Sequence, residues 1–417
     1  MSTKSPDFEI FGVGCGPANL GVAIALEEIA GPDLARNSLF VDKKPNFDWH
    51  PDMLLDSSVM QISFLKDLVT QRNPNSSFSF LSYLKHHDRL SDFINKQSFF
   101  PSRREFTDYL SWCCSRITCQ VRFDSKVISV SVDPSTGFNI VTWIQNGSEH
   151  VSTARYVVFG MGSSPDLPSW TDGLNTRVIH NSSLVSGARS TIGDYDARAR
   201  VAVVGQGQSA AESIRHILEK YPNCSVDTFW SGYGMVPADN SPFANRIFDP
   251  EAVDDFYFAP ASVRQSLIRR HKHTNYSCVD IDLIRWLYDF EYEEMVSGSN
   301  RLRIHRAHHI LDVRSREESV ELDVVDTLNG EEVLHSVDLC ICATGFSADY
   351  PRDIVGSVEG DSFYSKRDYR IVLNDVEMPW FAVGISDTPH GLSAGLLSNI
   401  SVRSGELVKS ISPSLCG

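Results

Sequence analysis

The stretch Glu9-Ile10-Phe11-Gly12-Val13-Gly14-Cys15-Gly16 decides the fold of this 417-residue chain. Its apolar residues are typical of a buried parallel strand, and apolar residues at helical spacing follow at positions 20–26. Glycines between such a strand and a helix allow a tight turn, so that a pyrophosphate can sit at the helix N-terminus. The turn therefore predicts a dinucleotide site with the candidate residues Gly14, Gly16, Pro17 and, where a third glycine is usual, Asn19.

The first turn and its helix are followed by a strand at residues 38–41. This strand ends at Asp42, whose carboxylate is placed to accept hydrogen bonds from a ribose hydroxyl. The pattern of strand and glycine turn then occurs a second time. About 190 residues after the first turn, a strand at 200–204 leads into a second one, formed by Gly205, Gln206, Gly207, Gln208 and Ser209. One glycine turn is weak evidence, because such turns also occur for structural reasons alone. Two of them predict two dinucleotides, typically a flavin and a nicotinamide, with hydride transfer between them.

Other patterns indicate how the chain is divided. Residues 127–158 alternate apolar and polar side chains around two turn signals, which predicts an antiparallel meander. Residues 232–300 read as helical, and the apolar run 339–345 is expected to return the chain to the first sheet. We predict an α/β protein with two Rossmann-like dinucleotide-binding domains, residues 1–165 with 337–417 and residues 166–231 with 301–336, and a small, mostly helical substrate module at 232–300.

Composition excludes several classes of protein. The net charge is −15 without any basic run, so neither nucleic acid nor an anionic membrane is an expected partner. Nine cysteines, an odd number without a C-x-x-C pair, argue against a disulfide framework and against a disulfide reductase. The histidines lack zinc-ligand spacing, so no metal is predicted. No signal peptide or membrane span is visible, and a cytoplasmic protein is expected.

The segment Met60-Gln61-Ile62-Ser63-Phe64-Leu65-Lys66-Asp67-Leu68-Val69-Thr70 resembles a hallmark of the microbial amino-acid N-hydroxylating flavin monooxygenases. The similarity extends in order along the chain, is closest to the L-ornithine N5-monooxygenases, and includes the segments 49–50, 72–74, 78–81, 100–106, 205–212, 239–245, 274–277, 390–393 and 396–398. It implies that FAD binds the first domain and NADPH the second. It further implies N-hydroxylation of the L-ornithine side-chain amine with O2 through a C4a-hydroperoxyflavin, in siderophore or related biosynthesis. An L-lysine N6- or diamine N-hydroxylase is the alternative, and a flavin-dependent sulfide or ketone monooxygenase a more distant one.

The resemblance also assigns residues to three binding sites. The expected FAD contacts are Gly14, Gly16, Pro17, Asn19, Asp42, Lys43, Trp49, His50, Gln61, Val127, Gly395, Leu396 and Leu397. The expected NADP contacts are Gly205, Gln206, Gly207, Gln208, Ser209, Ser231 and Asn275. The expected substrate contacts are Lys66, Asn245, Phe248, Asn275 and Ser398. The chemistry is centred on the flavin, so no side chain is expected to be catalytic, and Asn275 positions both amine and cofactor. Relatives are commonly homotetramers.

The residue types suit these roles, although they allow other interpretations. Lys66 follows an apolar stretch, where a cation binds a carboxylate well; the alternative is a solvated helix residue paired with Asp67 or another neighbour. Asn245 and Asn275 could be ordinary turn residues. As neutral groups they avoid favouring the ammonium form of an amine that must react through its lone pair. At Ser231 and Val236, where many relatives have arginine, this chain has none, which leaves NADPH or NADH open.

Overall fold

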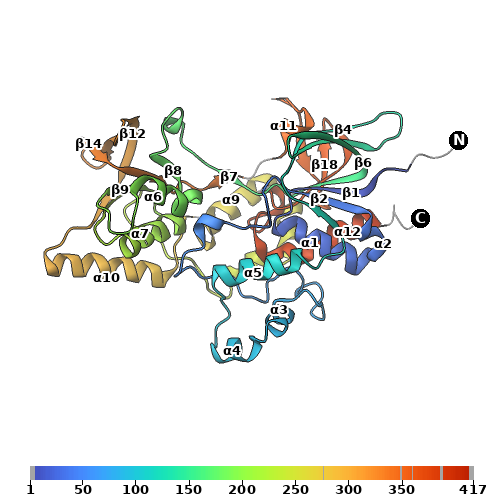
Figure 1. Cartoon of the computed structure of the whole chain (residues 1–417), viewed down its shortest axis with the longest axis horizontal. Coiled ribbons are helices and arrows are strands. Elements are labelled where there is room, and N and C mark those ends of the chain that lie inside the picture. The colour runs from blue at the N-terminus through green and yellow to red at the C-terminus, as the bar shows by residue number, and fades with distance from the viewer. Residues whose placement is uncertain (1–4, 276, 348–349, 359, 386–387, 413–417) are drawn as a thin grey trace.

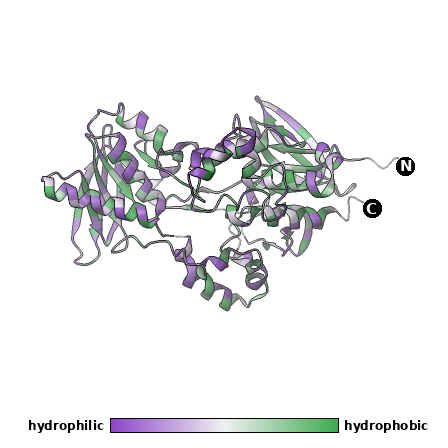
Figure 2. Cartoon of the chain, turned by 90° about the horizontal axis from the view of Figure 1, so that it is seen from below, coloured by the Kyte–Doolittle hydropathy of each residue, from purple (hydrophilic) through white to green (hydrophobic). Residues whose placement is uncertain are grey.

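The structure is a computed structural model that describes residues 5–275, 277–347, 350–358, 360–385 and 388–412. Two sheets lie at opposite ends of an elongated molecule, with both termini beside the first sheet (Figure 1). Seen from below, both ends carry hydrophobic residues along their strands (Figure 2). In the part of the chain that the structure describes, no helix has the length and apolar character needed to cross a membrane.

The first sheet is built around strand β1, which pairs in parallel with β2 and β6. The order of its main path is β17-β18-β19-β6-β1-β2-β3. Strands β4, β5 and β6 pair antiparallel, which confirms the predicted meander. The bounds are β1 (Phe8–Val13), β2 (Ser38–Val41), β3 (Gln120–Arg122), β4 (Ser125–Val132), β5 (Asn139–Gln145), β6 (Ser148–Phe159), β17 (Phe363–Ser365), β18 (Arg370–Leu373) and β19 (Val376–Ala382).

Helices cover the first sheet and project from it. Helix α1 packs against α12 so closely that a Cβ on Gly21 would lie 2.8 Å from the Ser404 hydroxyl oxygen. Between α1 and β2 the chain forms a π-helical turn, Leu26–Ala30, and the short helix α2, which account for the long spacing between Gly14 and Asp42. The bounds are α1 (Pro17–Ala25), α2 (Pro32–Arg36), α3 (Phe80–His86), α4 (Leu90–Asn95), α5 (Arg103–Cys114), α11 (Arg352–Val355) and α12 (Ile400–Ile411).

The second sheet is entirely parallel, in the order β11-β10-β9-β15-β8. Apolar residues of helices α6, α7 and α10 pack on one face, and the antiparallel strands β12, β13 and β14 cover the other. The bounds are β8 (Val178–His180), α6 (Leu184–Ile192), β9 (Arg200–Val204), α7 (Gln208–Lys220), β10 (Ser225–Trp230), β11 (Leu302–Arg306), β12 (His308–Ser315), β13 (Val320–Asp326), β14 (Glu332–Val337) and β15 (Leu339–Cys342).

Strand β15 corrects the sequence analysis. The run 339–345 was expected to return to the first sheet, but β15 lies in the second sheet between β9 and β8. The chain crosses back only afterwards, where β16 (Phe346–Ser347) pairs antiparallel with β7 (Ser164–Pro165). The chain passes from one half to the other at each of these two short strands, which lie side by side (Figure 1).

The segment 232–300 is helical, as predicted. It contains a short 3-10 helix, Ala244–Phe248, followed by α8 (Ala252–Phe258), α9 (Ala261–His271) and α10 (Ile281–Ser297). Helices α8 and α9 contact the segment Thr388–His390 of the first half, whereas α10 contacts α7 of the second half. The segment therefore bridges the two halves.

Candidate active site

The first glycine turn has the geometry of a phosphate cradle. Gly14 has φ +87°, and a Cβ there would lie 2.5 Å from the carbonyl oxygen of Gly160. A Cβ on Gly16, in contrast, would meet no atom within 4 Å. Helix α1 begins after Gly16 with Pro17 in its first turn and without a side-chain cap, so its first backbone N–H groups are available to an anion.

Asn19 holds this turn together. It is fully buried, and its Nδ2 donates to the carbonyl oxygens of Val13 (3.1 Å), Gly14 (2.7 Å) and Val158 (3.2 Å). The side chain therefore points into the protein, where it ties the turn to β6. Asn19 shapes the cradle through these three bonds.

Asp42 lies next to the cradle at the end of β2. Its Oδ2 accepts from the Cys15 N–H at 2.8 Å and its Oδ1 from the Lys44 N–H at 2.9 Å. Each carboxylate oxygen keeps a free lone pair, so a ribose hydroxyl can still donate to it. The neighbouring Lys43 is exposed, whereas Val127 is 8% exposed and packs into the core of the first half.

The residues predicted to line the flavin on the other side follow β2. Trp49 packs against Phe106, with ring centroids 6.1 Å apart, and Gln61 is exposed. His50 has φ +51°, and desolvation, together with the cations Arg103 and Lys44, lowers its pKa to about 4. The imidazole is therefore neutral at neutral pH.

The second glycine turn repeats the cradle. Gly205 has φ +133°, and a Cβ there would lie 2.4 Å from the carbonyl oxygen of Ala343. Gly207 precedes α7, which lacks a side-chain cap, and among the described residues a Cβ on Gly207 would have only the Ser277 Cα within 4 Å, at 3.9 Å. Ser231 is exposed at the end of β10. The two turns fit two dinucleotides on the same physical grounds.

Two glutamines of the second turn are held by neighbouring loops. Gln206 Oε1 accepts from the Gly232 N–H at 2.7 Å, and Gln208 Oε1 accepts from the Asp280 N–H at 2.9 Å. Ser209, in the first turn of α7, accepts through its carbonyl oxygen from the Ser213 hydroxyl at 2.7 Å. Asp280, the residue before α10, is thus bonded to this turn, and the shared role of Asn275 stays a prediction.

Lys66 is a half-buried cation without a partner. Its Nζ lies 5.9 Å from the ring centroid of Phe248, and no hydrogen bond or ion pair engages it among the described residues. Desolvation lowers the pKa of the ammonium group, and the Asp249 carboxylate partly offsets this. The alternative pairing with Asp67 is wrong, because that buried carboxylate accepts from Val69, Thr70 and Phe80.

Lys66 and Phe248 thus lie near each other, and their roles as substrate contacts stay predictions. Asn245 lies on the same short helix as Phe248, and its Nδ2 donates to the Asn240 carbonyl oxygen at 3.1 Å. No hydrogen bond within the described part of the chain joins Asn275 or Ser398 to this pair of residues. The Ser398 hydroxyl is buried and lacks a hydrogen-bond partner among the described residues, so it has bonding capacity for a ligand.

The family model described as L-lysine 6-monooxygenase/L-ornithine 5-monooxygenase matches residues 7–348. The chain belongs to this family. It is 37% identical to the L-ornithine N(5)-oxygenase of Arthrobotrys oligospora, over 97% of this chain and 88% of that protein. The ornithine N-hydroxylase of Kutzneria sp. 744, solved with reduced FAD, NADP+ and L-ornithine, has 37% identity and a TM-score of 0.92, with 98% of this chain and 100% of that chain covered. The L-lysine 6-monooxygenase of Pseudomonas syringae is less similar, at 26% identity and a TM-score of 0.82 over 98% and 100% of the chains.

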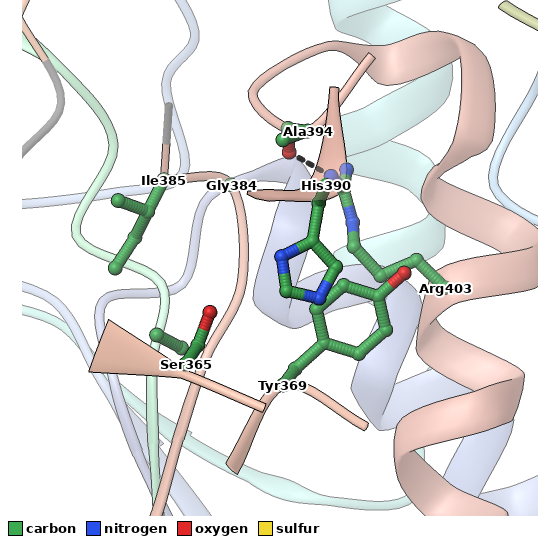
Figure 3. Close-up of a pocket in the computed structure, with 8 residues that line it drawn as sticks. Ser365, Tyr369, Gly384, Ile385, His390, Ala394 and Arg403 are labelled. Carbon is green, nitrogen blue, oxygen red and sulfur yellow. Dashed lines mark hydrogen bonds between the residues drawn. The ribbon is translucent and has the colours of Figure 1, made fainter. Parts of the chain in front are cut away.

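A buried arginine that no sequence pattern signals supports the loop with Gly395, Leu396 and Leu397, which was expected to approach the flavin. Arg403 on α12 donates to the carbonyl oxygens of Ala394 and, at 2.9 Å, Leu396. In Figure 3 it lies beside Tyr369 and His390, whose rings stack with centroids 4.7 Å apart. Gly395 is exposed between the two held carbonyl groups, and Leu397 packs against the core. Arg403 therefore holds the loop through two of the loop's own backbone carbonyl groups.

A second missed feature joins the two halves. Arg103 on α5 donates to Glu212 on α7 through two bonds of 2.8 and 3.0 Å, and Gln208 Nε2 donates to the same carboxylate at 3.0 Å. Residues Pro51–Met53 lie against α6, where Asp52 accepts from the backbone and hydroxyl of Ser186. No sequence motif signals such contacts, since their partners are far apart in the chain.

Proposed function

We propose that this protein hydroxylates the side-chain amine of L-ornithine at N5, with FAD, NADPH and O2 as co-reactants. The overall reaction converts amine, O2, NADPH and a proton to hydroxylamine, water and NADP+. The observation that carries the proposal is the half-buried Lys66 ammonium beside Phe248, which has no hydrogen-bond or ion-pair partner among the described residues, in a chain that also has two dinucleotide cradles. Names of similar proteins favour ornithine over lysine.

The two cradles determine how the cofactors would be held. The turn at Gly14 and Gly16, with Asp42, would bind FAD, and the turn at Gly205 and Gly207 would bind NADPH. When bound, the flavin accepts hydride from NADPH and activates O2 for transfer of one oxygen atom. The proposal includes the division into a flavin half and a nicotinamide half, the cytoplasmic location, the homotetramer and the place in siderophore or related biosynthesis.

Residues around the substrate would bind it and keep its amine neutral. Lys66 would pair with the α-carboxylate, since a desolvated cation without a partner gains most from an anion. An ornithine side-chain amine titrates near pH ~10 in water, so it must lose a proton before it can react. Asn245 would hold the α-amino end of the substrate, Asn275 would contact its side-chain amine, and Ser398 would lie beside it. All three side chains are neutral, so none adds a negative charge that favours the ammonium form.

The test compares three amines and one matched pair of variants. Purified, flavin-loaded protein is assayed for hydroxylamine formation with ornithine, lysine and putrescine. Ornithine should give the highest kcat/KM. Lys66→Met should raise the KM for ornithine about 10- to 100-fold, the equivalent of one charge-assisted hydrogen bond of ~1.5–3 kcal/mol. The KM for putrescine, which has no carboxylate, and the rate of flavin reduction should stay as they are.

Lys96→Met is the control. Lys96 Nζ also lies over a ring, 5.8 Å from that of Phe93, but it is exposed and outside the site. Its substitution should leave every kinetic constant unchanged. Equal effects of the two substitutions would reject Lys66 as the carboxylate anchor, and absence of hydroxylamine with all three amines would reject the function itself.

A further inference from the structure

Arg306 lies at the carboxyl edge of the second sheet, next to the end of β10. It is the last residue of β11 and pairs in register with Trp230, the residue before Ser231. Adjacent strands are ~4.8 Å apart, so the ends of β9, β10 and β11 form a short row along this edge. The glycine turn follows β9, Ser231 follows β10, and Arg306 ends β11.

Two hydrogen bonds fix this row. Gln206 of the glycine turn accepts from the Gly232 N–H at 2.7 Å, and the Gly232 carbonyl oxygen accepts from the Ala307 N–H at 2.9 Å. The packing is tight, because a Cβ on Gly232 would lie 2.8 Å from Gln206 Nε2. The backbone next to Arg306 is thus held at a constant distance from the turn that would bind the pyrophosphate.

The Arg306 guanidinium has unused donors. It is 42% exposed, and its closest carboxylate oxygen, on Glu291, is 3.9 Å away, which is beyond hydrogen-bond length. Its Cζ lies 5.9 Å from the ring centroid of the exposed Tyr233. No hydrogen bond from this guanidinium to any described residue is formed.

The other arginines near the start of β11 are already engaged. Arg301 donates to the carbonyl oxygens of Leu218, Tyr221 and Cys224. Arg303 binds both oxygens of Asp227, at 2.7 and 2.6 Å. Only Arg306, among these three, presents a free planar fork, which matches the oxygens of a phosphate.

We propose that Arg306 binds the 2′-phosphate of NADPH and gives this chain its preference over NADH. The inference rests on the proposed function, in which the second turn binds a nicotinamide dinucleotide. The end of the second strand is where such folds read the ribose 2′ position. The chain has no carboxylate at Ser231 to repel a phosphate and no arginine at Ser231 or Val236 to bind one. Arg306 supplies the missing charge from the next strand.

The test uses two ligands that differ only in the 2′-phosphate, 2′,5′-ADP and 5′-AMP, titrated calorimetrically into the flavin-loaded protein. The wild type should bind 2′,5′-ADP at least tenfold more tightly. Arg306→Gln should reduce that ratio at least tenfold and leave 5′-AMP binding unchanged, and Arg306→Lys should retain an intermediate ratio. In steady-state assays, kcat/KM should fall for NADPH and stay constant for NADH.

Arg316→Gln is the matched control. Arg316 is also exposed, although it binds Glu321 at 2.7 Å, and it lies near Asn175, at the amino edge of the same sheet. This variant should keep the wild-type ratio. Arg306→Gln with a wild-type ratio, or a wild type that does not distinguish the two ligands, would overturn the inference. Neither ligand takes part in amine hydroxylation, so this result is independent of which amine, if any, is the substrate.

Discussion

The ion pair between Arg103 and Glu212 should contribute more to stability than any exposed pair of the protein. The side chains are only 14% and 8% exposed, and two bonds of 2.8 and 3.0 Å join them across the two halves. Hydrogen bonds to charged groups contribute ~1.5–3 kcal/mol each, and removal of one partner from a buried pair costs ~3–5 kcal/mol. Arg103→Met should therefore lower the free energy of unfolding by about 3–5 kcal/mol.

The neighbouring residue provides the control. Arg104 pairs with Asp56 at 3.0 Å, but the two side chains are 69% and 59% exposed. An exposed pair contributes ~0–1 kcal/mol, so Arg104→Met should lower the free energy of unfolding by less than ~1 kcal/mol. Both residues are on the same helix, and both variants remove one positive charge.

Urea unfolding of Arg103→Met, Glu212→Gln and the double variant measures the interaction itself. We expect a coupling energy of ~2–3 kcal/mol, because either single substitution leaves a buried charge without its oppositely charged partner. Unfolding should be followed by two probes, since a two-domain chain need not unfold in one step. A coupling energy below ~0.5 kcal/mol, or equal effects of Arg103→Met and Arg104→Met, would refute this reasoning.

Three further outcomes follow from the site. Asn19→Ala removes three hydrogen bonds of a buried side chain and should lower the free energy of unfolding by ~2–4 kcal/mol, with faster loss of FAD in a dilution assay. Gly205 has φ +133°, and the new Cβ of Gly205→Ala would lie 2.4 Å from a carbonyl oxygen, so this variant should lose NADP+ binding in calorimetry. Gly234→Ala, whose new Cβ would meet no atom of the described residues within 4 Å, should leave NADP+ binding unchanged. The His50 ring should stay neutral in NMR titrations down to about pH 4. Because that pKa is lowered on folding, the unfolded chain takes up a proton first, so stability should decrease as pH falls from ~6.5 towards 4.

The features predicted from sequence are local ones. A strand, a turn and a helix that follow one another directly in the chain fix their own geometry, so both glycine turns, their strands and the meander were predicted at nearly the right bounds. The positive φ angles at Gly14 and Gly205 explain why glycine is required there.

The features missed from sequence are non-local ones. An apolar run does not specify its neighbours, so residues 339–345 were assigned to the wrong sheet. No sequence pattern signals the roles of Arg103 and Arg403, because their partners are distant in the chain or are backbone carbonyl groups. The fold also brings the side-chain ligand atoms of Asp227, His305 and His335 within 4.8 Å of one another, although their positions in the sequence match no metal-binding motif. Arg303 already binds both oxygens of Asp227, and its positive charge opposes a metal cation there.

The contacts between the halves have a functional consequence. In the proposed function, hydride transfer requires that two dinucleotides, each held by a different half, meet at one point. Gln208 donates to Glu212 and accepts from the Asp280 N–H, so it connects the Arg103 pair to the loop that carries Asn275. We expect a shift at Arg103 to be transmitted through Gln208 to the second glycine turn and to Asp280. For this reason substitutions at Arg103 should change the coupling of NADPH oxidation to hydroxylation, whereas substitution of the neighbouring, exposed Arg104 should leave it unchanged.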